Sequence, residues 1–249
     1  MPQPPNSVRP ELVIVNDAAA LARAAAQEFC RCAADALAAR GRFSVALSGG
    51  NTPRAVNSLL ANEPKDLPWS KIFIFFGDER HVPPDHPDSN YRMANETLLS
   101  RVPVPESNVF RVRAELDANA AADDYDRRLR EFFGIQIGAW PRFDLILLGM
   151  GDDGHTASLF PGSAALQEQS RLAVANWVEK FQSYRITLTF PVLNHGAEDL
   201  FLVSGDSKSQ VLREILGPAP KQAAYPAQMV RPQDGRLLWI ADKAAAHLL

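Results

Sequence analysis

Short apolar runs alternate with amphipathic or alanine-rich stretches along most of the chain. The apolar runs predict strands, and the longer stretches, with apolar residues at helical spacing, predict helices. Strands are expected over 12–15, 43–47, 71–76, 143–148, 172–178, 185–190, 199–203 and 237–240, with a candidate strand over 109–112. Helices are expected over 18–40, 53–61, 90–100, 118–132 and 207–216.

This order of elements predicts an α/β fold. The run 71–76 (KIFIFF) is almost wholly apolar, which is typical of a strand buried on both faces of a parallel sheet. Strands that alternate with helices favour βαβ units with right-handed crossovers, and hence a mainly parallel sheet flanked by helices. No repeat or low-complexity linker divides the chain, and 77–88 and 217–235 are expected to be loops. We therefore expect one domain over 1–249, with 1–10 flexible.

Composition narrows the class of protein. The chain is 46% hydrophobic and 22% charged, as is ordinary for soluble globular proteins. A net charge of −3 without a basic run argues against a nucleic-acid surface, so an anionic ligand needs a local cluster of Arg and Lys. The N-terminus MPQPPNSVRP is polar, and no long apolar run follows it, so neither a signal peptide nor a membrane span is expected and the predicted location is cytoplasmic. Cys30 and Cys32 match no zinc or redox spacing.

The segment 143–162, FDLILLGMGDDGHTASLFPG, holds the strongest candidate chemistry. A strand-like run stops at Gly149, Gly151 and Gly154, which predicts a tight turn where the backbone can approach a ligand. His155 follows at the carboxyl end of the strand, the edge where open α/β sheets bind ligands. A lone histidine is more often a capping or core residue, but the preceding Asp-Asp-Gly and this position favour proton transfer by His155.

A second junction, SGGNTP, predicts a phosphate-binding turn. Free N–H groups at the start of a helix, with the hydroxyls of Ser48 and Thr52, can hold an anion; Thr52 is expected to cap that helix. The lysine of a Walker loop is missing and GxGxxG is absent, so an ordinary glycine turn is the alternative. The candidate binding residues here are Ser48, Gly49, Gly50, Asn51 and Thr52.

A third junction, FGDERHVPPDHPDSN, places Asp78, Glu79 and Arg80 directly after the apolar run KIFIFF. Arg80 can hold an anionic or carbonyl oxygen with two hydrogen bonds, and the alternative is a solvated charged turn. Asp78 is a further candidate for substrate contact. Ser89 or Asn90 is the expected cap of the next helix.

The fourth junction, SGDSK, places Lys208 in the first turn of a helix. A lysine there opposes the helix dipole, so we expect an anion shared with the backbone amides to hold it; the alternative is an exposed lysine. Arg185, at the start of RITLTF, is a second basic candidate. In a parallel sheet all four junctions open at the same edge.

Together LSGGNTP, FGDERHVPPDHPDSNY, LGMGDDGHTASLFPG and SGDSK resemble the 6-phosphogluconolactonase family, the lactone hydrolases of the pentose phosphate pathway. The match is ordered along nearly the whole chain, and GMGxDGHTASLFPG is specific to the family. The resemblance implies the fold shared with glucosamine-6-phosphate deaminase and ribose-5-phosphate isomerase, a modified Rossmann-like sheet. It also implies a sugar-phosphate lactone as the small-molecule substrate, with no cofactor, metal, membrane or obligate protein partner.

By the same resemblance His155 is the catalytic base, Asp153 rather than Asp152 is the family aspartate, and Arg80 is the arginine of the DER motif. Lys208 matches the lysine that binds the sugar phosphate. Arg185 corresponds to a basic residue that helps to hold it. One further position, Asn51, departs from the serine common in the family, but its side chain can still donate a hydrogen bond.

The chemistry needs little else. Water can attack the ester carbonyl of a δ-lactone directly once a histidine has removed its proton, and a cation or amide donors can stabilise the oxyanion. Two alternatives remain. A glucosamine-6-phosphate deaminase places a carboxylate shortly after its DGH motif, where this chain has SLFPG. A non-catalytic sugar-phosphate sensor would tend to lack the histidine and to carry a DNA-binding segment.

Overall fold

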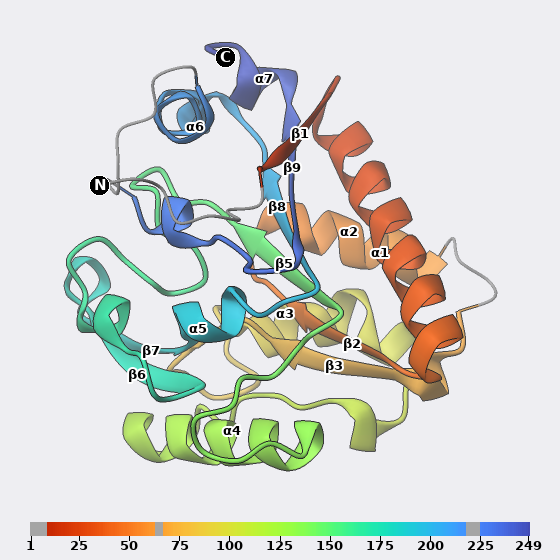
Figure 1. Cartoon of the computed structure of the whole chain (residues 1–249), viewed down its shortest axis with the longest axis vertical. Helices are drawn as coiled ribbons and strands as arrows, with labels where there is room; N and C mark the ends of the chain where they lie inside the picture. Colours follow the sequence, from red (N-terminus) through yellow and green to blue (C-terminus); the bar gives the residue numbers. More distant parts are fainter. Residues whose placement is uncertain (1–8, 63–66, 218–224) are drawn as a thin grey trace.

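The computed structural model describes residues 9–62, 67–217 and 225–249, and its centre is a six-stranded parallel sheet of order β1-β9-β8-β5-β2-β3 (Figure 1). Its strands are β1 (Glu11–Val15), β2 (Phe43–Leu47), β3 (Ile72–Phe76), β5 (Leu145–Gly149), β8 (Glu198–Val203) and β9 (Arg236–Asp242). A three-stranded antiparallel sheet of order β4-β7-β6 lies beside it, made of β4 (Asp78–Arg80), β6 (Ala173–Val178) and β7 (Ser183–Leu188).

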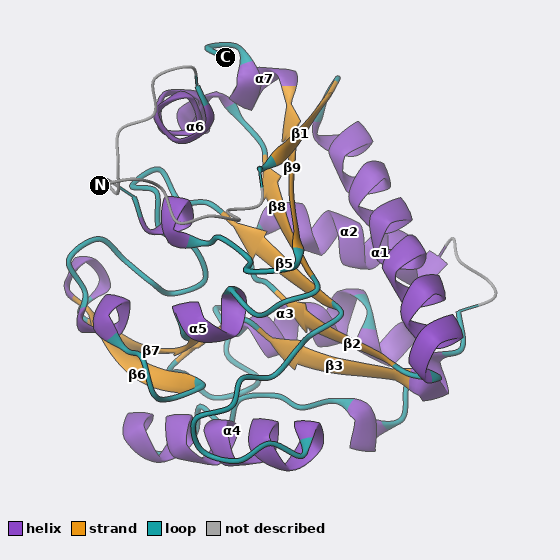
Figure 2. Ribbon diagram, in the orientation of Figure 1, coloured by secondary structure: helices purple, strands orange, loops and turns teal. Residues whose placement is uncertain are grey.

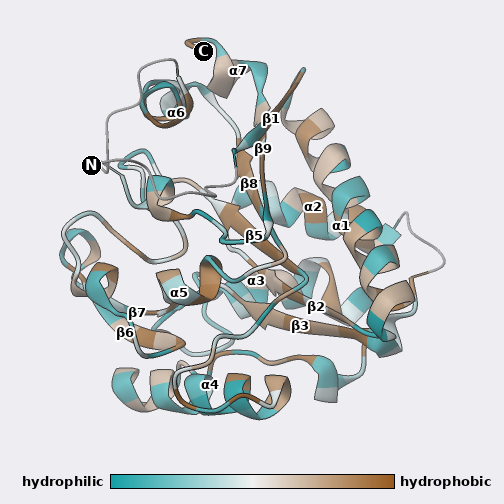
Figure 3. Cartoon of the chain, in the orientation of Figure 1, coloured by the Kyte–Doolittle hydropathy of each residue, from teal (hydrophilic) through white to brown (hydrophobic). Residues whose placement is uncertain are grey.

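Helices cover both faces of the large sheet (Figure 2). They are α1 (Ala18–Arg40), α2 (Asn51–Asn62), α3 (Asn90–Thr97), α4 (Ala118–Phe133), α5 (Phe190–Leu193), α6 (Ser209–Leu216) and α7 (Lys243–Ala246). Successive strand residues alternate between two hydrophobic cores: Leu145 and Leu147 pack with α1 and α2, while Ile146 and Leu148 pack with α4 and α6. The central strands are accordingly hydrophobic in Figure 3, and the outer faces of the helices are polar.

Most of the predicted elements are confirmed. Strand β2 has the predicted bounds, and α1 is capped by Asp17, which accepts a hydrogen bond from the Ala20 amide at 2.7 Å, and ends at Gly41 in the left-handed conformation. The mainly parallel sheet is confirmed as well. The expected flexibility of 1–10 and part of the 217–235 loop fall on residues 1–8 and 218–224, outside the described residues.

Four local predictions are wrong. The expected loop 77–88 contains strand β4, and 109–112 forms only an isolated bridge between Val109 and Ile74. The expected strand 185–190 ends at Leu188, because Phe190 starts helix α5. Thr52 is not the helix cap: α2 begins at Asn51, and the Gly50 carbonyl accepts the first helical hydrogen bond, from the Arg54 amide at 3.0 Å.

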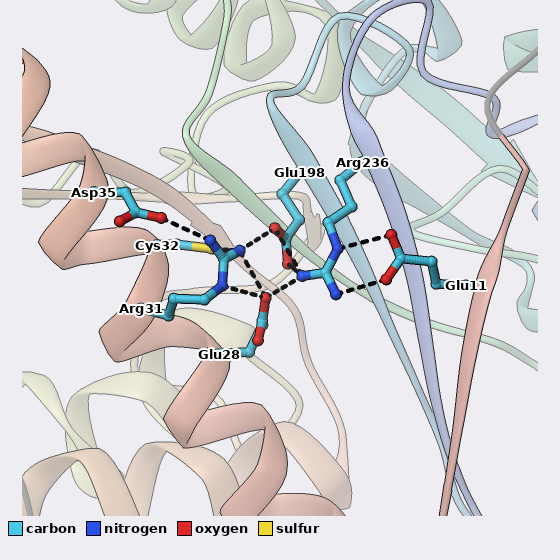
Figure 4. Close-up of polar contacts among 7 residues, drawn as sticks. All are labelled: Glu11, Glu28, Arg31, Cys32, Asp35, Glu198 and Arg236. Atoms are coloured by element: carbon cyan, nitrogen blue, oxygen red, sulfur yellow. Dashed lines mark hydrogen bonds and ion pairs between the residues drawn. The ribbon is translucent and has the colours of Figure 1, made fainter.

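A network of charged residues ties the amino ends of β1, β8 and β9 to helix α1 (Figure 4). Arg31 binds Glu28 at 2.7 Å and also Glu198, while Arg236 binds Glu11 at 2.8 Å, Glu198 at 3.3 Å and Glu28. Since Glu198 is only 4% exposed, the two guanidinium groups replace the water that its carboxylate lacks.

No helix among the described residues combines the length and the apolar character that a membrane crossing requires.

Candidate active site

The four polar junctions of the sequence meet at one edge of the large sheet. They follow β2, β3, β5 and β8, which are neighbours in the order β8-β5-β2-β3 and run parallel, so their carboxyl ends lie together. A cavity of about 230 Å³ opens there. Its lining comes from all four junctions: Ser48, Gly49, Asp78, Arg80, Gly149, Met150, Gly151, His155, Ala157 and Lys208.

His155 is held by Asp153 on one side and by an aromatic ring on another. Its Nδ1 lies 2.5 Å from Asp153 Oδ1, and its ring stacks on Phe160 at 4.0 Å between centroids. Because the carboxylate accepts from Nδ1, the neutral ring has its free lone pair on Nε2. Among the described residues no hydrogen bond engages Nε2, so this nitrogen can accept a proton from water.

The charge of Asp153 is secured by its neighbours. Burial opposes ionisation, but the hydrogen bonds from His155 and the nearby Lys180 outweigh it and lower the pKa of Asp153 to about 2. Asp153 is thus a carboxylate at any pH near neutrality, ready to orient the ring and to stabilise its protonated form.

The turn 151–155 owes its shape to close packing of the backbone. The Gly151 amide donates to the His155 carbonyl at 2.9 Å, and a Cβ on Gly151 would lie 2.1 Å from the imidazole Nδ1. Only glycine fits there, which explains the predicted tight turn. Ala157, two residues on, has φ = 47°, a strained value of the kind that gathers at functional sites.

Arg80 and Arg185 are directly opposite each other in the β4–β7 pair. Burial and the neighbouring charge of Arg80 lower the pKa of Arg185, and the buried Nε atoms of both side chains have no hydrogen-bond partner among the described residues. Like charges at directly opposite positions are unfavourable. An anion between or beside them would relieve both costs.

Asp78 and Glu79 form the scaffold under these arginines rather than a solvated turn. Asp78 Oδ2 accepts a hydrogen bond from Ser158 Oγ at 2.6 Å. Its Oδ1 accepts one from the side-chain Nδ2 of Asn90 at 3.2 Å. Glu79, 2% exposed, accepts from the Asn90 and Tyr91 amides at 2.7 and 2.8 Å at the start of α3, and burial raises its pKa.

Asn90 is a site residue that the sequence pattern did not reveal beyond helix capping. Its Oδ1 would lie 1.8 Å from a Cβ placed on Gly49, so Gly49 and the start of α3 are packed against each other. Next to this contact the buried Ser48 Oγ lines the cavity, and no residue in the described part of the chain bonds to it.

Lys208 is held by an anion of the protein itself. It lies in the short 3-10 turn before α6 and pairs with Asp152, which also accepts from Ser207 Oγ at 3.1 Å. The hydrogen bond from Lys208 lowers the pKa of Asp152. The carboxylate of Asp152 therefore offsets the unfavourable effect of placing the positive charge of Lys208 near the start of a helix.

Five of the candidate residues lie outside the lining of this cavity within the described chain: Gly50, Asn51, Thr52, Asp153 and Arg185. Asp153 instead borders an adjacent cavity of about 660 Å³, which Phe160, Trp177 and Lys180 also line.

The described residues that could together hold a metal ion lie away from the candidate active site. In the described part of the chain one group of potential ligand atoms, from Glu28, Cys32 and Glu198, lies within 4.8 Å. It belongs to the charged network at the amino edge, far along the strands from His155. Arg31 and Arg236 already bind its carboxylates, and their charges oppose a cation.

Comparison with known proteins agrees with this geometry. A family model for glucosamine-6-phosphate isomerases/6-phosphogluconolactonase matches residues 16–239, and the chain belongs to this family. It is 45% identical over 215 residues to the 6-phosphogluconolactonase of Synechocystis sp., covering 86% of this chain and 88% of the relative. The predicted resemblance is thereby confirmed.

Solved structures are similar over nearly the whole chain. The 6-phosphogluconolactonase from Trypanosoma cruzi has a TM-score of 0.88 and 31% identity, covering 98% of each chain. A monomeric glucosamine-6-phosphate deaminase has a TM-score of 0.79 at 19% identity, covering 96% of this chain and 100% of its own, and shows a shared fold alone. The predicted fold class is confirmed.

Proposed function

We propose that this chain hydrolyses 6-phospho-D-glucono-1,5-lactone to 6-phosphogluconate, the lactone-opening step of the oxidative pentose phosphate pathway, with His155 as general base. Its membership of the family and the 6-phosphogluconolactonases among its relatives support the reaction. The single observation that carries the mechanism is the His155–Asp153 pair beside a cavity that also presents Arg80 and Lys208.

Water is the nucleophile in this mechanism. His155 Nε2 removes its proton as the oxygen attacks the lactone carbonyl, and Asp153 stabilises the imidazolium that forms. The tetrahedral intermediate then collapses, and the imidazolium returns the proton to the leaving ring oxygen. Arg80 or the amides of the glycine turns stabilise the oxyanion.

The phosphate holds the substrate away from the breaking bond. Lys208 and the turn 48–52 bind it, with Arg185 behind Arg80 adding positive charge. Ser48 Oγ and the Nε atoms of the two arginines are buried and lack partners within residues 9–62, 67–217 and 225–249, which supports an anionic ligand at this edge. Remote binding of this kind fixes the carbonyl next to the base.

The deaminase alternative needs a carboxylate free to move a proton between carbon atoms. Among the residues that line the cavity, the carboxylate is Asp78, and Ser158 and Asn90 already bind its oxygens. This engagement favours the hydrolase.

A coupled assay with freshly generated 6-phosphogluconolactone, corrected for spontaneous hydrolysis, tests the proposal. We expect enzyme-dependent formation of 6-phosphogluconate and no ammonia from glucosamine-6-phosphate. Ammonia release without lactone hydrolysis would replace the lactonase by the deaminase.

A further inference from the structure

The two carboxylate oxygens of Asp153 have different partners. Oδ1 faces the imidazole Nδ1 of His155 at 2.5 Å, and the His155 amide at 3.3 Å. Oδ2 accepts from Lys180 Nζ at 3.2 Å. A carboxylate held at both oxygens cannot rotate about its Cβ–Cγ bond without losing a charged contact, so Lys180 restricts the orientation that Asp153 imposes on the ring.

Lys180 lies in a turn that hydrogen bonds hold in one conformation. It lies in the 3-10 turn Glu179–Phe181 that joins β6 to β7. Glu179 fixes this turn, since its carboxylate accepts from Trp177 Nε1 at 2.9 Å and from Gln182 Nε2 at 2.7 Å. The backbone that carries Lys180 is therefore held in place by hydrogen bonds within the β6–β7 turn, although 58% of the Lys180 side chain is exposed.

A second contact joins the same hairpin to the histidine. Phe181 packs edge-on against Phe160 with 5.8 Å between centroids, and Phe160 stacks on His155. Arg185, further along β7, lies over the Phe181 ring at 5.0 Å. One hairpin thus reaches the imidazole twice, through the carboxylate and through the aromatic stack.

Lys180 does not line the cavity that holds the proposed substrate. Lys208, Arg80 and Asp78 do, and they face His155 from the other junctions, with Asp152 paired to Lys208. On the β6–β7 side Lys180 bonds to Asp153, whereas the carboxylate of Glu179, which lines the same adjacent cavity, bonds to Trp177 and Gln182.

We propose that Lys180 is a positioning residue of the reaction: it locks the Asp153 carboxylate and opposes the proton on His155, without touching the substrate. The inference rests on the proposed function for its role in turnover. The Lys180 ammonium and a protonated imidazole would share one carboxylate, and two cations beside the same anion repel each other. The low pKa of Asp153, to which Lys180 contributes, agrees with this arrangement.

The test compares Lys180→Met, which keeps the length of the side chain but removes its charge, with Lys180→Arg, which keeps the charge. In Lys180→Met the acid limb of the kcat/KM profile should move up by about 0.5 pH unit, the order expected for one screened charge several ångströms away. The KM should stay within about two-fold, and Lys180→Arg should restore the limb. Lys71→Met is the matched control, because it removes an exposed lysine at the amino end of β3.

A second measurement needs no turnover. An NMR titration of the His155 ring, assigned with His155→Gln, should show its protonation midpoint displaced upward in Lys180→Met by the same amount. The inference would be overturned if neither the His155 protonation midpoint nor the acid limb of kcat/KM moved in Lys180→Met. It would also be overturned if Lys180→Arg failed to restore the limb, or if KM rose while the limb stayed in place. If the wild type failed to hydrolyse the lactone while the midpoint still moved, the proposed function would fall and the Lys180 coupling would stand.

Discussion

At the scale of single residues, the proposed mechanism gives each ring nitrogen of His155 a different task. Asp153 takes Nδ1, which leaves Nε2 for the water, and the stack on Phe160 fixes the plane of the ring. This geometry supports the proposed role of His155 as a base.

Replacement of His155 by alanine should leave the fold intact and lower kcat at least ~100-fold, the usual contribution of a general base, with little change in KM. Steady-state kinetics on purified protein, with far-UV circular dichroism as a folding check, measures this. His86→Ala, in the β4–α3 loop, is the control. Near wild-type turnover in His155→Ala would place the base elsewhere.

The neighbouring carboxylate has its own signature. Because its pKa is about 2, Asp153 stays charged through the whole working range and should not itself produce a limb near neutral pH. Asp153→Asn removes that charge, so the imidazolium loses its stabilisation: the acid limb should shift to lower pH while kcat falls at least ~10-fold. A pH series from 5 to 9 distinguishes this from simple loss of folding, which would scale every point equally.

At the scale of elements, the carboxyl ends of β2, β3, β5 and β8 lead into the segments that line the cavity, and the 3-10 turn before α6 carries Lys208. If Lys208 binds phosphate, Lys208→Ala should lose ~10–150-fold in kcat/KM on the phosphorylated lactone, as expected for a charge-assisted hydrogen bond. Unphosphorylated gluconolactone should be nearly unaffected.

Asp152→Asn is the matched control for that prediction, since it releases Lys208 from its ion pair without removing the cation. Its kcat/KM should change far less. Equal losses on both lactones in Lys208→Ala would move the phosphate contact to Arg80 or Arg185.

The sequence predicted those elements whose signal is local. Strand β2 and helix α1 follow from apolar runs and from the Asp17 and Gly41 caps. Strand β4 was missed because Asp-Glu-Arg has the polarity of a turn; it is a strand only because β7, about a hundred residues later, pairs with it. The same pairing created the Arg80–Arg185 contact.

The residues of the candidate site that follow strand ends could likewise be predicted from the sequence, and those that depend on distant segments could not. His155, Ser48 and Lys208 follow strand ends, so periodicity and parallel topology alone place them at one edge. Asn90 against Gly49, and Lys180 against Asp153, depend on how loops and the hairpin fold back. Periodicity carries no record of such contacts between distant segments.

At the scale of the whole molecule, the parallel sheet separates two charged regions. The candidate active site lies at the carboxyl edge, whereas the network of Figure 4 lies at the amino edge and joins β1, α1, β8 and β9. Since both hydrophobic cores share the one sheet, we propose that the described chain is a single folding unit, and calorimetry should show one unfolding transition.

The amino-edge network should make the stability of the fold depend on pH. Burial, and then the hydrogen bond and charge of Glu28, raise the pKa of Glu198 to about 7, against the opposing effect of the two arginines. A raised pKa in the folded state means that the stabilisation is complete below the ordinary value of 4.5 and is lost as the pH rises through 7.

Glu198→Gln should therefore flatten the pH dependence of the melting temperature. Between pH 5 and 8 the wild type should lose about 2–4 °C relative to the variant, the shift that ~1 kcal/mol produces in a chain of this size. Asp35→Asn is the control, because Asp35 is 68% exposed and pairs only with Arg31 among the described residues. Parallel melting curves for Glu198→Gln and the wild type would show that Glu198 stays ionised between its arginines. Because the network and His155 lie at opposite edges of the sheet, kcat at 25 °C should be the same in both proteins, and a fall in kcat would contradict the separation of stability from catalysis.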